Sequence, residues 1–297
     1  MSNSFTKKQH YIPQTYLRGF SPEYEKLNRS NVDKSKYTIW QYNIDINEQS
    51  KISVPIKSIC RKNDLYELFD KDGNYINHNW LERVFGALEK MFSKYRKQLE
   101  EKAFIKENLS SRCFLTREER KFWSTYIILQ YLRLPEILFM VENDALSGFG
   151  DEIKDFEIKN LARELCIPLF RELKEDSIEL KVFNALYSPL TSMEFHIGVD
   201  GDCSLITSDK TIFASADGFP CNEYDELYFP ITSSICLILL GGKNRNKMKD
   251  NTVFLLEEDI RDYINMCIAG NAFNTVYSNH RLSKEEKKLF RKSRTEN

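Results

Sequence analysis

The sequence lacks the long apolar run that a membrane-spanning helix requires. Its longest unbroken apolar stretch is residues 235–240, far short of the roughly twenty residues that cross a bilayer as a helix. The opening residues, MSNSFTKKQH, contain no apolar segment of the kind found in signal peptides. We therefore expect a soluble chain that is not exported by a recognisable signal and has no membrane partner.

Paired cysteines and a surplus of charge are also missing. The seven cysteines are scattered and form no CxxC pair, which is typical of reduced thiols in a cytoplasm. The four histidines show neither HxxxH nor HExxH spacing, so we expect no zinc cluster. With 43 basic and 44 acidic residues the formal net charge is -1, and a nucleic-acid partner would need a local basic patch. The prediction is a cytoplasmic protein.

What the chain does contain is enough apolar material for a sizeable core, since 41% of its 297 residues are hydrophobic. The stretch 116–135, TREERKFWSTYIILQYLRLP, predicts a central helix, with Thr116 as N-cap and acidic residues in the first turn. Its later residues leave no polar face, so this helix should be buried. Only Gln130 and Arg133 interrupt the apolar run, and their spacing places them on the same side.

We predict one α+β domain, 1–297, in four consecutive parts: a β-rich lead-in (1–78), a helical middle (79–187), a mainly antiparallel sheet with a C-terminal helix (188–281), and a basic, solvated tail (282–297). Helices are expected at 79–103, 116–135, 136–146, 155–173, 257–277 and 284–292, after a short one with Pro13 at its first position. Strands are expected at 36–44 with 52–54, at 64–69 with 75–76, at 192–199 with 203–207, and at 227–240 and 252–256.

Arg133 is the strongest candidate for a functional residue, because an unpaired guanidinium inside a core is very costly. It must therefore meet a carboxylate, a carbonyl or a ligand. Glu82 and Glu89 share one face of helix 79–103, Gly86 between them keeps that face open, and packing of the two helices brings one glutamate to Arg133. A structural ion pair with Glu89 and recognition of a phosphate or carboxylate both fit this pattern. The glutamates could also bind a metal ion, act as acid and base, or simply face solvent.

Further candidates lie near the two ends of the chain. His10 precedes the first helix and could act as a general acid/base or brace the N-terminal segment. Asp209 follows a predicted strand and could bind a metal ion, orient His10, or, with its neighbour Ser208, stop the strand in an Asx or ST turn. Ser208 lacks a GxSxG environment, which disfavours it as a hydrolase nucleophile.

Seven separated segments resemble the landmarks of the bacterial domain-of-unknown-function family 4238. They are HYIPQTYLRGF (10–20), KSICRKNDLY (57–66), WLERVFGALE (80–89), LQYLRLP (129–135), LITSD (205–209), YFPIT (228–232) and INMCIAGNAFNTVYS (264–278). The resemblance implies a set of polar positions, namely His10, Glu82, Glu89, Gln130, Arg133, Asp209 and Asn265. One departure is Lys210-Thr211, where relatives commonly carry Asn-Pro. The resemblance supplies no settled activity, but it favours convergence of His10, Glu89, Gln130, Arg133 and Asp209.

The hypothesis that follows is a bacterial hydrolase acting on a phosphodiester, an RNA-directed nuclease serving as a toxin or antiviral effector. In it His10 is the general acid/base, Arg133 stabilises charge on the phosphate, and Gln130 orients it. The carboxylates position His10 or a divalent metal ion, which leaves the cofactor open. The residues expected to contact the substrate are Tyr16, Glu82, Ser208 and Asn265.

Two other functions remain open. The same polar set could recognise a nucleotide, a peptide or a partner protein without catalysis. The chain could also be a structural subunit, which would present a large exposed apolar patch. Carboxylates and His10 around one vacant cleft would favour catalysis, whereas a fully paired Arg133 would favour a scaffold.

Overall fold

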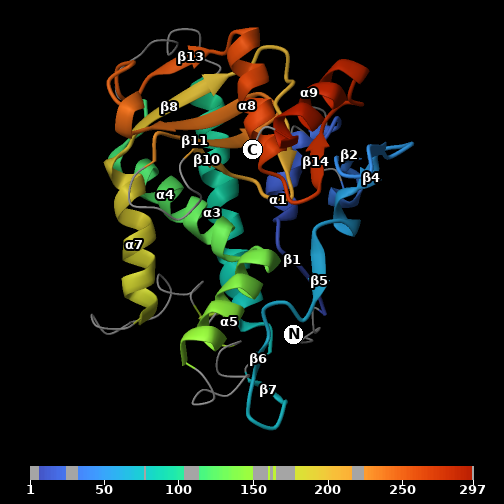
Figure 1. Cartoon of the computed structure of the whole chain (residues 1–297), viewed down its shortest axis with the longest axis vertical. Helices are drawn as coiled ribbons and strands as arrows, with labels where there is room; N and C mark the ends of the chain where they lie inside the picture. Colours follow the sequence, from blue (N-terminus) through green and yellow to red (C-terminus); the bar gives the residue numbers. More distant parts are fainter. Residues whose placement is uncertain are drawn as a thin grey trace.

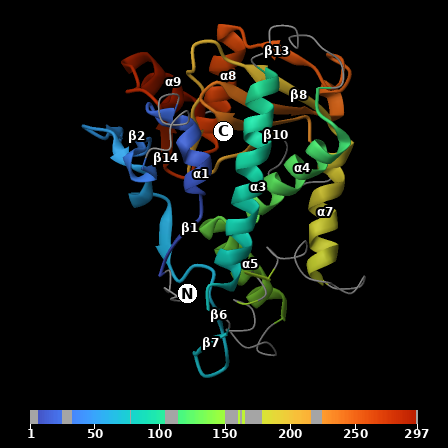
Figure 2. The ribbon, with the colours of Figure 1, turned by 180° about the vertical axis from the view of Figure 1, so that it is seen from behind.

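The structure is a computed structural model, and it describes residues 7–24, 33–76, 78–103, 114–149, 160, 163–164, 178–215 and 224–295. Helices α3 (Trp80–Ala103) and α4 (Arg117–Leu132) lie against one face of a five-stranded sheet, and α8 (Glu258–Gly270) lies on the other side (Figure 1, Figure 2). A second sheet stands beside the first. The predicted α+β class is confirmed.

The larger sheet comes from the C-terminal third of the chain. Its strand order is β10 (Phe213–Ser215), β11 (Glu226–Thr232), β12 (Ile235–Leu240), β8 (Glu194–Val199) and β13 (Val253–Leu255). All neighbours are antiparallel except β13, which runs parallel to β8. The sheet is therefore mainly antiparallel, as predicted, and the stretch predicted as 227–240 is a hairpin of two strands.

Alternation along these strands divides the core into two layers. Leu227, Phe229 and Leu237 belong to the cluster that faces α3 and α4, whereas Tyr228 and Ile238 belong to the cluster on the α8 side. This is the period of two that a strand imposes on its side chains. Because both faces are covered, the strands are apolar almost throughout, and each buried Leu or Phe contributes roughly 1.5–3 kcal/mol.

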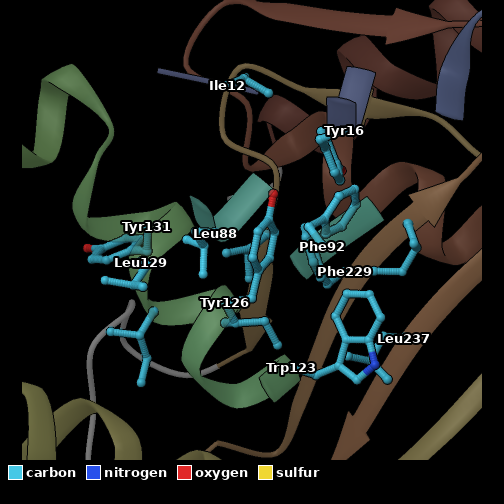
Figure 3. Close-up of a cluster of buried hydrophobic side chains, with 14 of the residues drawn as sticks. Ile12, Tyr16, Leu88, Phe92, Trp123, Tyr126, Leu129, Tyr131, Phe229 and Leu237 are labelled. Atoms are coloured by element: carbon cyan, nitrogen blue, oxygen red, sulfur yellow. The ribbon is translucent and has the colours of Figure 1, made fainter. Parts of the chain in front are cut away.

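Aromatic rings fill the space between the helices and the sheet. Figure 3 shows Trp123 and Tyr126 of α4 beside Phe92 of α3 and Phe229 of β11. Phe92 stacks on Tyr126 with ring centroids 4.6 Å apart, and Tyr126 lies 6.1 Å from Phe229. These ring contacts hold α4 against both α3 and β11.

Helix α4 begins as the sequence predicts. The Thr116 side chain accepts from the backbone N–H of Glu119, and the Glu119 carboxylate accepts from that of Thr116, which completes a capping box. The chain continues into α5 (Pro135–Phe149), which confirms the helix predicted at 136–146. Helix α7 (Ile178–Ser192) packs on α4 from the other side. The helix predicted at 155–173 falls largely outside the described residues.

The second sheet joins both ends of the chain. Its order is β3 (Glu48–Gln49), β2 (Thr38–Asn43), β14 (Thr275–Ser278) and β9 (Thr207–Ser208), with β4 (Val54–Pro55) also paired to β2. The predicted pairing of 36–44 with 52–54 holds only at Val54, opposite Ile39. The strands of the lead-in are thus completed by strands from the C-terminal third.

The remaining elements are short. Strand β1 (Lys8–His10) pairs with β5 (Arg61–Asn63), and β6 (Leu68–Phe69) pairs with β7 (Tyr75–Ile76) as predicted. Helix α1 (Gln14–Leu17) continues into the 3-10 turn η1 (Arg18–Phe20), and Pro13 is its N-cap rather than its first residue. The other 3-10 turns are η2 (Lys34–Lys36), η3 (Ile56–Ser58) and η6 (Gly242–Asn244).

The predicted hairpin of 192–199 with 203–207 is wrong. Strand β8 pairs with β12 and β13, and β9 pairs with β14 in the other sheet. The Asp200 carboxylate accepts from the N–H groups of Asp202 at 3.1 Å and Ser204 at 2.6 Å. The polar turn is closed by a side chain rather than by a ladder of strand hydrogen bonds, and the chain crosses to the second sheet.

Two predictions about the C-terminus also fail. Helix α8 ends at Gly270 with Asn271 as C-cap, because residues 275–278 form β14, the strand between β2 and β9. The helix predicted at 284–292 is present as α9 (Lys284–Thr295), but it packs against α8 and is not a solvated tail. Phe290 is buried, and Arg294 donates to the backbone carbonyls of Ala272 and Phe273. Among the described residues, each helix is too short or too polar to cross a bilayer.

Candidate functional site

Two side chains at the end of α4 bind the backbone of the N-terminal segment. Gln130 Nε2 donates to the carbonyl oxygen of Tyr11 at 3.2 Å, and Arg133 Nη2 donates to that of His10 at 2.7 Å. The prediction that Gln130 and Arg133 project from the same side is thereby confirmed. Because the two carbonyls are consecutive, the pair holds the link between β1 and α1 at two points.

Arg133 is buried in a close-fitting environment, with 1% of its surface exposed. Its Nη1 lies 3.8 Å from Glu89 Oε1, and the guanidinium lies 4.2 Å from the centre of the Phe85 ring. Tyr66 donates to the Arg133 carbonyl oxygen at 2.6 Å and accepts from Arg133 Nε at 3.4 Å. Burial opposes the charge, but the Tyr66 oxygen and the Glu89 carboxylate outweigh it, so the pKa of Arg133 is raised. The ion pair with Glu89, one of the two interpretations that the sequence left open, is present.

The acidic face of α3 lies beside this guanidinium. Glu89 Oε2 accepts from Thr15 Oγ1 at 3.4 Å. Burial raises the pKa of Glu82 to about 6, because it outweighs the attraction of Arg133 and is assisted by the charge of Glu89. A Cβ added at Gly86, between the two glutamates, would meet no atom within 4 Å. As predicted, the glycine leaves this face of the helix open.

His10 is held as a neutral imidazole. Burial lowers its pKa to about 4, and the nearby charges of Arg61 and Arg133 add to this, while a hydrogen bond with the backbone of Lys57 opposes it. At neutral pH the ring is therefore uncharged. A neutral imidazole can accept a proton, which is the state that a general base requires.

We call the side chains of His10, Glu82, Glu89, Gln130 and Arg133 the Arg133 centre. Four of them carry a buried polar atom that has no hydrogen-bond partner among the residues the structure describes: His10 Nε2, Glu82 Oε2, Gln130 Oε1 and Arg133 Nη1. Folded proteins seldom leave such atoms unpaired, and each one requires an explanation. These four unpaired atoms make the Arg133 centre the candidate functional site.

Asp209 belongs to a different site. Its carboxylate accepts from the backbone N–H groups of Phe273, Asn274 and Thr275 at 2.8–2.9 Å. Burial raises its pKa to about 6, and those hydrogen bonds only partly counter the effect. No hydrogen bond within the described part of the chain joins Asp209 to the Arg133 centre.

Asp209 instead lines a polar pocket of about 500 Å³ together with Tyr11, Cys60, Glu136 and Tyr277. The Cys60 thiol bonds to the Tyr277 hydroxyl at 3.2 Å, and burial raises its pKa to about 12, so it is not a nucleophile at neutral pH. Tyr11 connects the two sites, because Gln130 of the Arg133 centre holds its carbonyl.

The other residues expected to contact substrate are engaged with the protein. The Tyr16 hydroxyl is fully buried, lies 2.8 Å from Thr207 Oγ1 and donates to the Pro230 carbonyl. Ser208 Oγ donates to the Lys210 carbonyl at 2.6 Å and accepts from the Lys210 N–H at 3.2 Å, the latter bond forming an ST turn after the strand. Asn265 bridges the backbone by accepting from Ile206 N–H and donating to the Ser204 carbonyl. Each of these side chains holds the β9 segment or its neighbours.

The described residues do not form a metal site from their own side chains. Among the residues that the structure describes, no group of three or more His, Cys, Asp or Glu side chains is placed to hold a metal ion. The divalent ion considered from the sequence therefore stays a prediction.

Sequence reasoning missed several residues of the two sites. Tyr66 and Thr15 contact the Arg133 centre, and Tyr11 and Glu136 line the pocket. Tyr66 and Tyr11 lie in segments that carry the family resemblance, which was the available signal. Thr15 lies in the same resembling segment as Tyr11, whereas Glu136 lies outside all seven segments and carried no such signal.

The chain belongs to the family described as Protein of unknown function (DUF4238), whose model matches residues 8–281. The match covers the whole Arg133 centre and Asp209, and it confirms the resemblance seen in the sequence. No curated protein and no solved structure matches the chain.

Proposed function

We propose that this protein is a hydrolase that cleaves phosphodiester bonds in RNA, with the Arg133 centre as its active site. The observation that supports this most is the presence of unpaired, buried His10 Nε2 and Glu82 Oε2 in one polar centre with Arg133. A proton acceptor, a proton donor and a cation are the groups that an acid–base phosphodiesterase needs.

The protonation states favour RNA as the substrate class. RNA carries its own nucleophile, the 2′-hydroxyl, so its cleavage can proceed with a base, an acid and a cation. With a pKa of about 4, His10 is neutral and can act as the base. With a pKa of about 6, Glu82 keeps its proton in weakly acidic solution and can act as the acid.

The proposed reaction balances within these groups. His10 Nε2 takes the proton of the 2′-hydroxyl while O2′ forms a bond to phosphorus. The bond from phosphorus to O5′ breaks, and Glu82 donates its proton to O5′. The products are a 2′,3′-cyclic phosphate and a 5′-hydroxyl, after which solvent returns His10 and Glu82 to their starting states. Arg133 balances the phosphate charge and fixes the backbone at His10.

The test is cleavage of a 5′-labelled RNA and of a 5′-labelled DNA of the same sequence by the purified protein, because the labelled RNA fragment then carries the new phosphate end. We expect cleavage of the RNA alone, with a cyclic phosphate end. His10→Ala and Glu82→Gln should each slow it about 10²–10⁴-fold. The matched control is Glu101→Gln, which alters an exposed glutamate of the same helix. Intact RNA, or equal rates in all variants, would refute the proposal.

Toxicity tests the proposed setting as a toxin or antiviral effector. Induced expression of the wild-type chain in bacteria should slow growth, and His10→Ala should relieve the effect at equal protein level. Equal growth of the two strains would argue against this setting without touching the chemistry.

A second candidate function is supported by the contacts of Arg133 itself. The guanidinium donates to a backbone carbonyl and lies on the Phe85 ring, which is how a structural arginine is bound. In this case the Arg133 centre is part of a module that binds RNA or a nucleotide without cleaving it. Binding of labelled RNA, followed by fluorescence anisotropy, combined with recovery of intact RNA would establish this alternative.

A further inference from the structure

A second pocket lies at the opposite end of α4, between its first turns, the C-terminal half of α7 and the start of β8. Its volume is about 410 Å³, within the range of small-molecule sites. Figure 1 and Figure 2 show α4 and α7 side by side at this place. By helix rise, Arg117 and Arg133 are about 24 Å apart along the axis, so this pocket is distinct from the Arg133 centre.

The pocket is lined by cations. Arg117, Arg120, Lys121 and Ser124 all face it from one stripe of α4, as their three- and four-residue spacing requires. Basic side chains in the first turns of a helix work against the helix dipole, which favours negative charge at that end. Helix stability therefore does not account for three cations here. The same dipole adds its positive end to the pocket.

Existing ion pairs leave part of this charge free. Arg120 binds Asp250 with a nitrogen–oxygen distance of 2.7 Å, and Lys121 lies 3.4 Å from the exposed Glu118. For Arg117, no ion pair is formed within the portion of the chain that the structure describes. Among the described residues that line the pocket, none is acidic. An anion would consequently meet a site whose net charge is positive.

Ser124 provides an independent sign of a ligand. The residue is 1% exposed, it lines the pocket, and its hydroxyl has no hydrogen-bond partner among the described residues. A serine inside a helix ordinarily bonds back to the carbonyl four residues earlier. A buried hydroxyl that forgoes this bond remains available to a group inside the pocket.

We propose that this pocket binds the phosphate group of a small organic phosphate. Arg117 and Lys121 pair with the phosphate oxygens, and the Ser124 hydroxyl donates a hydrogen bond to one of them. The rest of the ligand lies against Tyr187 and Phe195, the aromatic residues of the lining. This inference does not depend on RNA cleavage, since it uses none of the residues of the Arg133 centre.

Isothermal titration calorimetry of the full chain tests the proposal. The probes are inorganic phosphate, adenosine 5′-monophosphate and adenosine. We expect the nucleotide to bind and adenosine not to bind, with inorganic phosphate competing. Tighter binding of the nucleotide than of inorganic phosphate would identify an organic phosphate rather than the free ion as the ligand. Equal affinity for the two would overturn that part of the proposal.

Matched variants locate the binding. Arg117→Gln and Ser124→Ala should each weaken nucleotide binding at least tenfold, while Arg281→Gln, at an exposed arginine elsewhere, should leave it unchanged. Ser124→Ala removes a hydroxyl without a partner, so the variant should fold with an unchanged or higher melting temperature. Absence of binding by either phosphate at millimolar concentration, or equal affinities in all four proteins, would overturn the proposal.

Discussion

Arg133 and His10 are joined through the backbone: the guanidinium of Arg133 donates to the carbonyl oxygen of His10 at 2.7 Å. A buried cation at the end of α4 thus holds the first strand of the chain, more than a hundred residues earlier. The same side chain lies 3.8 Å from Glu89 of α3. One arginine therefore connects three segments, and any catalysis by His10 depends on it for position.

This linkage predicts that Arg133→Met lowers stability as well as function. The variant loses a charged hydrogen bond and leaves the His10 carbonyl unpaired, so the free energy of unfolding should fall by about 2–3 kcal/mol. Urea unfolding followed by circular dichroism measures this loss. The control is Lys90→Met, at an exposed cation of α3, which should change stability little. If Arg133→Met were as stable as wild type, the hydrogen bond from Arg133 to the His10 carbonyl would contribute nothing to the free energy of unfolding.

Substitutions at Gly86 distinguish effects on folding stability from effects on the access of substrate to Glu82 and Glu89. Replacing a glycine in a helix interior by alanine gains about 0.5–1 kcal/mol, and no atom obstructs the added methyl group. Gly86→Ala should therefore be more stable than wild type. Gly86→Leu should fill the space between Glu82 and Glu89 and slow RNA cleavage at least tenfold without loss of stability. Ala87→Leu, at the exposed neighbouring position, is the control; unchanged cleavage by Gly86→Leu would exclude this face as the substrate's path.

Glu82 predicts a pH dependence of stability. Its pKa is raised from 4.5 to about 6 in the folded protein, so the protonated form favours folding. The contribution is complete below pH 4.5 and is lost as the pH rises through 6. Glu82→Gln removes this loss and should be about 1–2 kcal/mol more stable than wild type at pH 8, with little difference at pH 4. Urea unfolding at pH 4 and pH 8 measures this. If the difference in free energy of unfolding between Glu82→Gln and wild type were the same at both pH values, the raised pKa of Glu82 would be contradicted.

Asp209 should act on stability alone. Its two carboxylate oxygens accept three backbone N–H groups, whereas an asparagine offers one oxygen and turns an NH₂ group toward the others. Asp209→Asn should cost about 1–3 kcal/mol of stability and leave RNA cleavage per folded molecule unchanged. The control is Asp72→Asn in an exposed turn. A selective loss of cleavage at unchanged stability would return Asp209 to the active site.

The features of α4 that could be predicted from the sequence are those that depend only on residues within a few positions of each other. Thr116 and Glu119 form their capping box wherever the helix packs, and the spacing of Gln130 and Arg133 fixes their common side. An ion pair of Arg133 with Glu89 was one interpretation of packing the amphipathic helix 79–103 against the buried helix, and the structure contains it. The partners of Gln130 and Arg133 on β1 could not be predicted, because every residue has a carbonyl and the sequence does not mark which one is buried.

The errors arose where long-range contacts override a local pattern. Asp200 and its neighbours have the composition of a hairpin turn, but the Asp200 carboxylate satisfies the backbone and directs the chain to another sheet. Residues 275–278 continue a helical period, yet pairing with β2 makes them a strand. The placement of Asp209 in a separate pocket depends on this strand, so the sequence could not separate it from the Arg133 centre.

The pH dependence of kcat/KM for RNA cleavage decides whether His10 acts as the base and Glu82 as the acid. His10 must be neutral and Glu82 protonated, and their pKa values are about 4 and about 6. We expect kcat/KM of the wild type to be highest between these two pH values and to fall above pH 6. The fall should be absent in Glu82→Gln, and His10→Ala should have a greatly reduced kcat/KM at every pH. A rate that rises steadily through pH 8, or a His10→Ala profile equal to that of wild type, would contradict these roles.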